Sequence, residues 1–299
     1  MTALTIHNRN IPVLTGKWAD YELLDSGNRQ KLERFGDYVL IREEAKAWWR
    51  PELPEAAWKN AVAAHLAEDN VGWVFRNKAL PAEWLIQVAD LTIEGRITAT
   101  SKHIGIFPEQ YDHWRWIGAQ IEQAARPIRL LNLFGYTGVA SLIAAKHGAS
   151  VTHVDSAKGI VTWARRNQQL SGLDTAPIRW IVDDAATFVK REVRRARQYD
   201  AIILDPPTFG RGPKGELWQN EEHLVALLAD CRQLLSEQPL LIVMTLYSIS
   251  QSALLISNLL HDMMQPFGGV VDVGEFALQP ENSPKILPMS IFGRWSHAA

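Results

Sequence analysis

The second half of the chain alternates short apolar runs with longer segments of helical periodicity, and this feature restricts the possible folds most strongly. From about residue 126 onward, each run of Val, Ile and Leu precedes a segment whose apolar residues recur every three or four positions. The expected strands are Ile128–Phe134, Val151–Asp155, Ile178–Val182, Tyr199–Leu204 and Leu240–Leu246. The expected helices are Val139–His147, Ala157–Leu170, Ala185–Arg197, Glu221–Leu235 and Ser252–Met264. Repeated strand–helix units predict a parallel sheet covered by helices on both faces.

The end of the chain departs from this alternation. Two strand-like runs, Val270–Leu278 and Met289–Trp295, are joined by QPENSPKILP, which is too short for a helical crossover. We therefore expect an antiparallel hairpin here. The predicted fold class is α/β: a Rossmann-like, doubly wound, mostly parallel seven-stranded sheet with a C-terminal antiparallel hairpin, preceded by an N-terminal α+β accessory region.

The N-terminal part has a weaker pattern. Strands are expected at Gly36–Arg42, Gly72–Phe75 and Leu91–Thr100, and a helix at Pro54–Ala67. We divide the chain into an accessory domain, residues 1–115, and a domain built on the predicted sheet, residues 116–299.

Composition excludes several classes of protein and site. The 299 residues are 47% hydrophobic and carry a net charge of −2, so disorder is not expected and any nucleic-acid contact must be local. The single cysteine, Cys231, excludes an intramolecular disulfide and any cluster of thiolates, and no histidine spacing suggests a metal site. No signal peptide or membrane-spanning run is evident, so we expect a cytoplasmic protein without membrane association. The oligomeric state is left open.

A glycine-containing turn follows the first predicted strand, in Asn132-Leu-Phe-Gly135-Tyr136-Thr137-Gly138. Glycine permits close backbone approach, and the start of the next helix offers free N–H groups. The spacing matches neither a dinucleotide fingerprint nor a P-loop, which favours a ligand without phosphate at this position.

Aspartates follow the next two predicted strands. Asp155 ends the second strand, where an acid can accept hydrogen bonds from ribose hydroxyls, and Asp183-Asp184-Ala185 ends the third, where an acid can accept from an adenine amino group. The alternative for Asp184 is a purely structural role as the N-cap of the following helix.

The most specific local signal is Asp205-Pro206-Pro207-Thr208-Phe209, directly after the fourth strand. Two prolines fix the backbone and leave carbonyl oxygens free to accept from a planar nitrogenous group. Asp205 adds an ionisable acceptor, and Phe209 offers a ring on which a base can stack. The alternative is a rigid strand exit with a core aromatic residue.

Together, FGYTG, Asp155, the Asp184-Ala185 pair and DPPTF resemble the motifs of class I S-adenosylmethionine-dependent methyltransferases, over about residue 100 to the end. The pattern is most similar to the bacterial branch that methylates large-subunit ribosomal RNA to 5-methylcytosine or N7-methylguanine. The resemblance implies S-adenosylmethionine as cofactor, with the turn under its methionine part, Asp155 at its ribose and Asp184 at its adenine. The implied cofactor-binding residues are Asn132, Gly135, Tyr136, Thr137, Gly138, Asp155, Asp184 and Asp205. The segment Lys102–Gln110 is similar to a loop that closes over the cofactor, which adds Phe107 and Gln110.

The chain also departs from these relatives. Methylation of cytosine C5 needs a cysteine that adds covalently to the ring. In the relatives that modify cytosine this cysteine follows the fifth strand, where this chain reads Thr245-Leu246-Tyr247-Ser248, so a cytosine C5 target is disfavoured. A guanine N7 or an exocyclic amine already carries a lone pair, so positioning would supply most of the catalysis. No PUA-type RNA-binding domain is recognisable.

We therefore expect an enzyme that transfers the methyl group of S-adenosylmethionine to a nucleobase nitrogen in RNA, with ribosomal RNA as the candidate substrate and with Asp205, Pro206 and Phe209 acting on the base. Two basic segments are local candidates for RNA contact: the helix bearing Lys190–Arg197, whose alternative is a solvated face, and the loop Arg211–Gly215, as a phosphate grip or a mobile lid. Other hypotheses are methylation of a small metabolite or a protein, and a non-catalytic adaptor that binds the cofactor. A dehydrogenase is disfavoured by the glycine spacing and the terminal hairpin.

Overall fold

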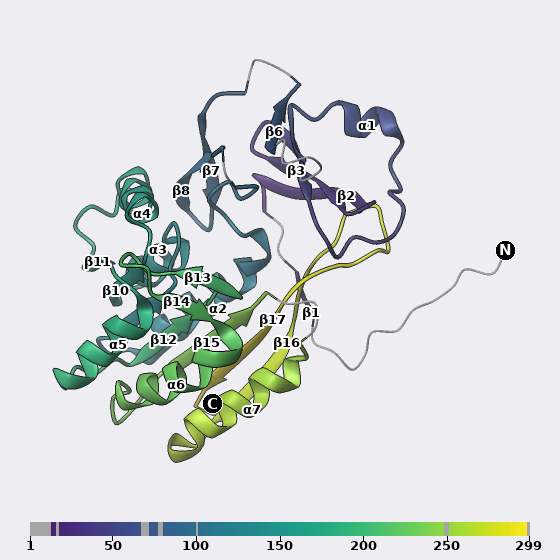
Figure 1. Ribbon diagram of the computed structural model, residues 1–299. Coiled ribbons are helices and arrows are strands. Elements are labelled where there is room, and N and C mark those ends of the chain that lie inside the picture. Colours follow the sequence, from purple (N-terminus) through teal and green to yellow (C-terminus); the bar gives the residue numbers. More distant parts are fainter. Residues whose placement is uncertain are drawn as a thin grey trace.

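A large, mostly parallel sheet forms the centre of the protein (Figure 1). The computed structural model describes residues 13–15 (backbone only), 18–66, 72–76, 80–99, 101–247 and 251–297. In spatial order the strands are β1 (Val13–Thr15), β16 (Val270–Leu278), β17 (Leu287–Ser296), β15 (Leu241–Leu246), β12 (Ala201–Leu204), β9 (Arg129–Leu133), β10 (Ser150–Asp155) and β11 (Ile178–Val182). Only β17 runs antiparallel to its neighbours. The seven predicted strands and the terminal hairpin are confirmed, and β1 adds an eighth strand at one edge.

Helices cover both faces of this sheet because neighbouring residues of each buried strand point to opposite sides. Leu131 and Ile202 pack with α5 (Ala185–Arg194), α6 (Asn220–Gln233) and α7 (Ala253–Met264). Leu130 and Ile203 pack on the other face with α2 (Tyr111–Ala124) and α3 (Val139–Lys146). The predicted helices over residues 139–264 are confirmed to within a few residues at each end, including α4 (Lys158–Leu170).

The N-terminal part forms a second sheet. Its order is β2 (Tyr21–Gly27), β3 (Gln30–Phe35), β4 (Tyr38–Glu43), β5 (Ala63–Leu66) and β6 (Gly72–Phe75), and a separate hairpin pairs β7 (Glu83–Val88) with β8 (Leu91–Arg96). The helix expected at Pro54–Ala67 is wrong between residues 60 and 66, and Ala67 lies outside the described residues. Helix α1 (Glu55–Lys59) is short, and β5 then pairs in parallel with β4, which draws this alanine-rich segment into a sheet.

The two parts share one buried cluster. Tyr21, Phe35 and Ile93 of the N-terminal part pack in the same core as Phe276 and Leu287 of the terminal hairpin. Our proposed domain boundary after residue 115 lies within α2, which packs against the large sheet. In Figure 1 the N-terminal sheet stands above the large sheet, so that residues of both can line one cavity.

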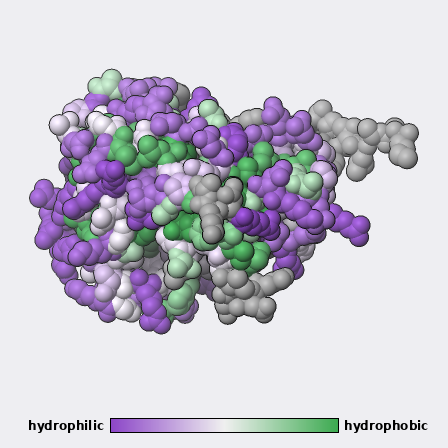
Figure 2. Space-filling view, turned by 90° about the horizontal axis from the view of Figure 1, so that it is seen from above, coloured by the Kyte–Doolittle hydropathy of each residue, from purple (hydrophilic) through white to green (hydrophobic). Residues whose placement is uncertain are grey.

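The surface carries no continuous apolar face in the view from above (Figure 2), where hydrophobic residues form separate areas among hydrophilic ones. Within the described ranges, no helix is both long and apolar enough to cross a membrane.

Candidate active site

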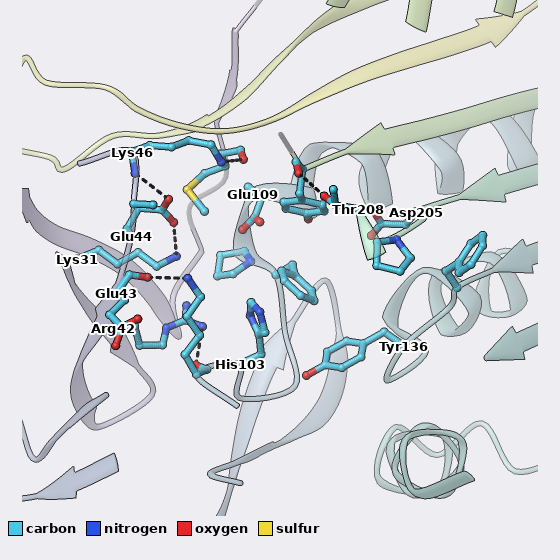
Figure 3. Close-up of a pocket in the computed structure, with 18 of the residues that line it drawn as sticks. Lys31, Arg42, Glu43, Glu44, Lys46, His103, Glu109, Tyr136, Asp205 and Thr208 are labelled. Atoms are coloured by element: carbon cyan, nitrogen blue, oxygen red, sulfur yellow. Dashed lines mark hydrogen bonds and ion pairs between the residues drawn. The ribbon is translucent and has the colours of Figure 1, made fainter. Parts of the chain in front are cut away.

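A cavity of about 560 Å³ lies between the carboxyl ends of the central strands and the N-terminal sheet (Figure 3). Asp155 from the end of β10 and Asp205 from the end of β12 line one side of it, and Lys31 and Arg42 from β3 and β4 line the other. A smaller pocket of about 50 Å³ adjoins it and shares Asp205 with it. The edge of an open α/β sheet thus forms a binding site, as sheets of this type commonly do.

The glycine turn is tight and lies against β10. Phe134 and Tyr136 have positive φ angles of 57° and 50°, and Gly135 N donates to the Val154 carbonyl at 3.1 Å. A Cβ atom at Gly135 would lie 2.4 Å from the ring of His153, so only glycine fits without displacing that ring. The turn therefore brings its backbone into the wall of the smaller pocket.

Buried hydrogen bonds hold the rest of this motif. Asn132 Nδ2 donates to Ser141 Oγ at 2.9 Å, and Thr137 Oγ1 donates to the Gly105 carbonyl at 2.5 Å. The second bond connects the turn to the segment 102–110 predicted to close over the cofactor. Gly138 has a φ of 86° and precedes α3. Asn132, Gly135, Tyr136 and Thr137 line the smaller pocket, together with Phe107 and Gln110.

Asp155 is oriented by the backbone. Its Oδ2 accepts from Tyr136 N at 3.0 Å and its Oδ1 accepts from Ala157 N at 2.9 Å. Burial raises the pKa of this carboxyl, while the two backbone donors lower it. Each oxygen keeps further accepting capacity, and Asp155 lines the larger cavity, which suits two vicinal hydroxyl groups.

The structure places Asp184 differently from Asp155. Its carboxylate caps α5, with Oδ1 accepting from Thr187 N at 2.8 Å. The adjacent Asp183 pairs with Arg191 at 2.7 Å. Neither aspartate lines the two pockets, and the side-chain hydrogen bond of Asp184 among the described residues is that of an N-cap, while its contact with adenine stays a prediction.

Asp205 directly follows β12 and lines both pockets. Gln110 Nε2 lies 3.4 Å from its Oδ2, whereas its Oδ1 is buried without a hydrogen-bond partner in the described part of the chain. Burial, with the nearby Glu109 carboxyl, raises the pKa of Asp205 to about 8. Pro206, predicted to act on the base, is buried and lines neither pocket, and the Pro207 carbonyl accepts from Trp218 Nε1 at 2.8 Å.

Phe209 does not reach the cavity. It begins β13 (Phe209–Arg211), which pairs with β14 (Leu217–Gln219), and its side chain is 56% exposed. The predicted loop 211–215 is the tip of this hairpin. Aromatic walls in the cavity come instead from Phe107, Phe134, Tyr136 and Tyr247.

Several cavity residues were missed from the sequence. Glu109 is 1% exposed, and neither of its carboxyl oxygens makes a hydrogen bond of good geometry with the described residues, although its carboxyl raises the pKa of the nearby Tyr247. Tyr247 O–H lies 3.1 Å from Gln110 Nε2. Glu109 could have been predicted, because it is next to Gln110 in the segment expected to close over the cofactor. Nothing in the sequence links Lys31 or Arg42 to these residues, which are more than 60 positions away.

These features fit S-adenosylmethionine. Asp155 presents acceptors for the ribose hydroxyls, and the glycine turn offers close backbone approach for the amino-acid part. The unpartnered Asp205 Oδ1 at the junction of the pockets suits a donor group such as an ammonium or an amine.

Comparisons with known proteins agree with this geometry. The family model of S-adenosylmethionine-dependent methyltransferases matches residues 81–262. A crystal structure of a SAM-dependent methyltransferase from Agrobacterium tumefaciens is 44% identical, covers 97% of this chain and 95% of its own, and superposes with a TM-score of 0.93. A structure from Streptococcus mutans, 19% identical over 92% of this chain and 75% of its own with a TM-score of 0.70, shares the fold.

Curated relatives are more distant. Ribosomal RNA large subunit methyltransferase K of Neisseria meningitidis serogroup B is 26% identical over 71% of this chain and 60% of its own length. The corresponding K/L protein of Shewanella frigidimarina is 26% identical over 82% of this chain and 38% of its own. The chain thus spans less than two thirds of each. The family model, the Agrobacterium structure and the site geometry together show that this chain belongs to the S-adenosylmethionine-dependent methyltransferases, with S-adenosylmethionine as its methyl donor.

Proposed function

We propose that the enzyme methylates a nitrogen of a nucleobase in RNA, with ribosomal RNA as the natural source. The observation that carries the proposal is the unpartnered Oδ1 of Asp205, which lies in a cavity walled by the rings of Phe107, Phe134 and Tyr247. Flat aromatic walls suit a heterocycle, and a buried acceptor suits an N–H group on its edge.

A nitrogen target agrees with the nucleophiles that the chain has. Cys231 is the only cysteine, it lies on α6 with its side chain buried in the core, and burial raises the pKa of its thiol. It cannot add to a pyrimidine ring bound in the cavity. A nitrogen lone pair attacks the sulfonium methyl group directly, so the protein has to hold the two atoms in line and exclude water.

The residues of this chain divide that work. Asp205 would hold the edge of the base, and Gln110 would orient Asp205 through its contact of 3.4 Å. S-adenosylmethionine supplies the methyl group when bound, and Asp155 with the Gly135 turn would fix its position.

Support for RNA comes from the relatives and from the mouth of the cavity. The Neisseria and Shewanella relatives are named as ribosomal RNA large subunit methyltransferases. Pro207 and Thr208 line the cavity and lead directly into the hairpin β13–β14, which carries Phe209 with Arg211 and Lys214. An exposed ring beside two cations can contact nucleotides that flank the target base.

The test uses the purified protein with methyl-tritiated S-adenosylmethionine and separate fractions of total RNA, ribosomal subunits, protein and small metabolites. We expect label in RNA or ribosomal subunits, its loss in Asp205→Ala, and no loss in the matched control Asp174→Ala, which changes an exposed loop aspartate. Label confined to protein or metabolites would overturn the RNA proposal. If RNA is labelled equally by wild type and by Asp205→Ala, the role given to Asp205 would be overturned instead. Nuclease digestion of labelled RNA then identifies the methylated atom.

A further inference from the structure

Glu109 is a buried acid to which the mechanism above gives no role. It lies in the short 3₁₀ turn Pro108–Gln110 that leads into α2, and it lines the larger cavity (Figure 3). Its side chain is almost completely buried, and neither carboxyl oxygen makes a hydrogen bond of good geometry with the residues that the structure describes. The Tyr247 hydroxyl is close enough for Glu109 to raise the pKa of that phenol, and it is a weak partner for a buried charge. A buried carboxyl with so little compensation is costly, so its presence calls for an explanation.

Charges nearby do not satisfy it. Lys31 and Arg42 lower the pKa of Glu109, but burial outweighs them and raises it overall. Both cations are already committed to Glu33: Arg42 Nε lies 2.8 Å from Glu33 Oε2, and Lys31 Nζ lies 3.4 Å from Glu33 Oε1. Glu109 therefore has no cation of its own.

A second unsatisfied acid faces the same space. Asp205 Oδ1 also lacks a donor, and the Glu109 carboxyl is one of the two causes that raise the pKa of Asp205. Three carboxyl oxygens of two residues that line one cavity thus lack a well-formed hydrogen bond among the described residues. Burial raises the pKa of both acids, so N–H groups brought by an occupant would both satisfy these oxygens and favour their ionised form.

Glu109 lies between Asp205 and the N-terminal sheet. It lines the larger cavity, it raises the pKa of Asp205, and Lys31 and Arg42 act on its own pKa. Asp155, placed at the cofactor ribose, lines the same cavity but is not among the groups that act on Glu109. Glu109 thus lies in the part of the cavity that extends toward Lys31 and Arg42.

We propose that Glu109 binds the methyl acceptor directly, as a carboxylate that accepts hydrogen bonds from its N–H groups, and that the acceptor is therefore an amino-bearing heterocycle. The inference rests on the proposed nucleobase acceptor and adds a specificity to it. Cytosine, adenine and guanine each present an amino group, while uracil presents two carbonyl oxygens around a single N–H.

The central variant is Glu109→Gln, which keeps the shape and removes the charge and half of the accepting capacity. The matched control is Glu122→Gln, the same change at an exposed residue of α2 that pairs with His147 at 2.7 Å. We expect Glu109→Gln to lower kcat/KM for the labelled RNA by about 30-fold, as for loss of a hydrogen bond to a charged group. The affinity for S-adenosylmethionine, measured by calorimetry, should stay within about twofold of wild type, because Glu109 contacts the methyl acceptor and not the cofactor in this proposal. A twofold change is small beside the change expected from a lost hydrogen bond.

Thermal unfolding separates this role from a structural one. An acid that supports the fold would lower the melting temperature when replaced, whereas an unsatisfied buried acid kept for binding should give an equal or higher one. Glu109→Asp provides a second variant, which retains the charge on a shorter side chain and should recover part of the lost activity. Normal kcat/KM in Glu109→Gln would overturn the inference, and so would a parallel loss of cofactor affinity or a lowered melting temperature without rescue by Glu109→Asp.

A failure to label RNA would overturn only the proposed function. A separate binding experiment tests the role of Glu109 in that case. The protein saturated with S-adenosylhomocysteine is titrated with nucleosides that differ in an amino group: cytidine against uridine, guanosine against inosine, and adenosine against purine riboside. We expect a preference of about tenfold for the amino-bearing member of at least one pair, and its loss in Glu109→Gln. No preference in any pair, or a preference unchanged by Glu109→Gln, would overturn the role of Glu109.

Discussion

The side-chain amide of Gln110 lies between Asp205 and Tyr247, 3.4 Å from the Asp205 Oδ2 and 3.1 Å from the Tyr247 hydroxyl oxygen. Its carbonyl oxygen faces His113 Nδ1 at 3.2 Å, and burial keeps the pKa of that imidazole well below its usual range. A neutral His113 can donate from Nδ1, which fixes the amide with its NH₂ group toward Asp205. The end of β12, the end of β15 and the start of α2 are connected through this one amide.

Gln110→Leu should lower turnover by about tenfold, because Asp205 loses a positioning contact of ordinary hydrogen-bond strength, about 1 kcal/mol. His113→Phe should have a smaller effect of the same sign, since it releases only the orientation of the amide. Single-turnover kinetics at saturating cofactor measure both. Unchanged rates in Gln110→Leu would show that Asp205 needs no partner at Oδ2.

Asp205 should make stability depend on pH. Its pKa of about 8 in the folded protein lies above the ordinary aspartate value, so the folded state retains a proton that the unfolded state has lost. Stability therefore decreases as the pH rises from about 4 to 8. Asp205→Asn removes this dependence. Relative to wild type, the free energy of unfolding of Asp205→Asn should therefore increase as the pH rises from about 4 to 8. Urea unfolding at several pH values measures the difference, and parallel curves for the two proteins would contradict the raised pKa.

Asp155→Asn should weaken S-adenosylmethionine binding by about 10- to 100-fold, because a hydrogen bond to a charged group contributes about 1.5–3 kcal/mol. The change also introduces an N–H₂ group where Tyr136 N and Ala157 N now donate. Calorimetry on the purified variant gives the affinity directly. An affinity equal to wild type would remove Asp155 from the binding site.

Asp184→Ala distinguishes the cap from a cofactor contact. Loss of the bond from Thr187 N should cost about 1 kcal/mol of stability, as for other N-caps. Because Asp184 does not line the cavity, cofactor affinity should change much less than in Asp155→Asn. A large loss of affinity with little loss of stability would favour the contact with adenine that the family resemblance implies.

Gly135→Ala should destabilise the protein by about 1–3 kcal/mol, the usual cost of forcing atoms into a filled space, since its Cβ would meet the His153 ring. Gly159→Ala is the matched control: it lies in α4 with no atom within 4 Å of the added Cβ, and it should stabilise by about 0.5–1 kcal/mol. Denaturant unfolding of the two variants checks the opposite signs.

The sequence predicted the large sheet well because the information there is local. Buried parallel strands are continuous apolar runs, and the helices between them keep one apolar face, so each element is visible in its own residues. The glycine turn at Gly135 and the Asp205 motif were visible for the same reason: their geometry depends on the residue types at those positions.

The N-terminal sheet was less visible because long-range pairing stabilises it. Strand β3 buries Lys31 and Glu33, and a buried Arg42 on β4 pairs with Glu33, which hides the alternation expected of a half-buried strand. Residues 63–66 favour helix by composition but form a strand because β4 offers an unpaired edge.

The sequence by itself therefore determined the sheet, the glycine turn and the acids at its edge, because local patterns specify buried strands and tight turns. Tertiary structure decided the composition of the cavity: it placed Glu109 beside Asp205, brought Lys31 and Arg42 to the opposite wall, and left Phe209 on an exposed hairpin. The physical reason is that burial and electrostatic coupling depend on which distant segments meet.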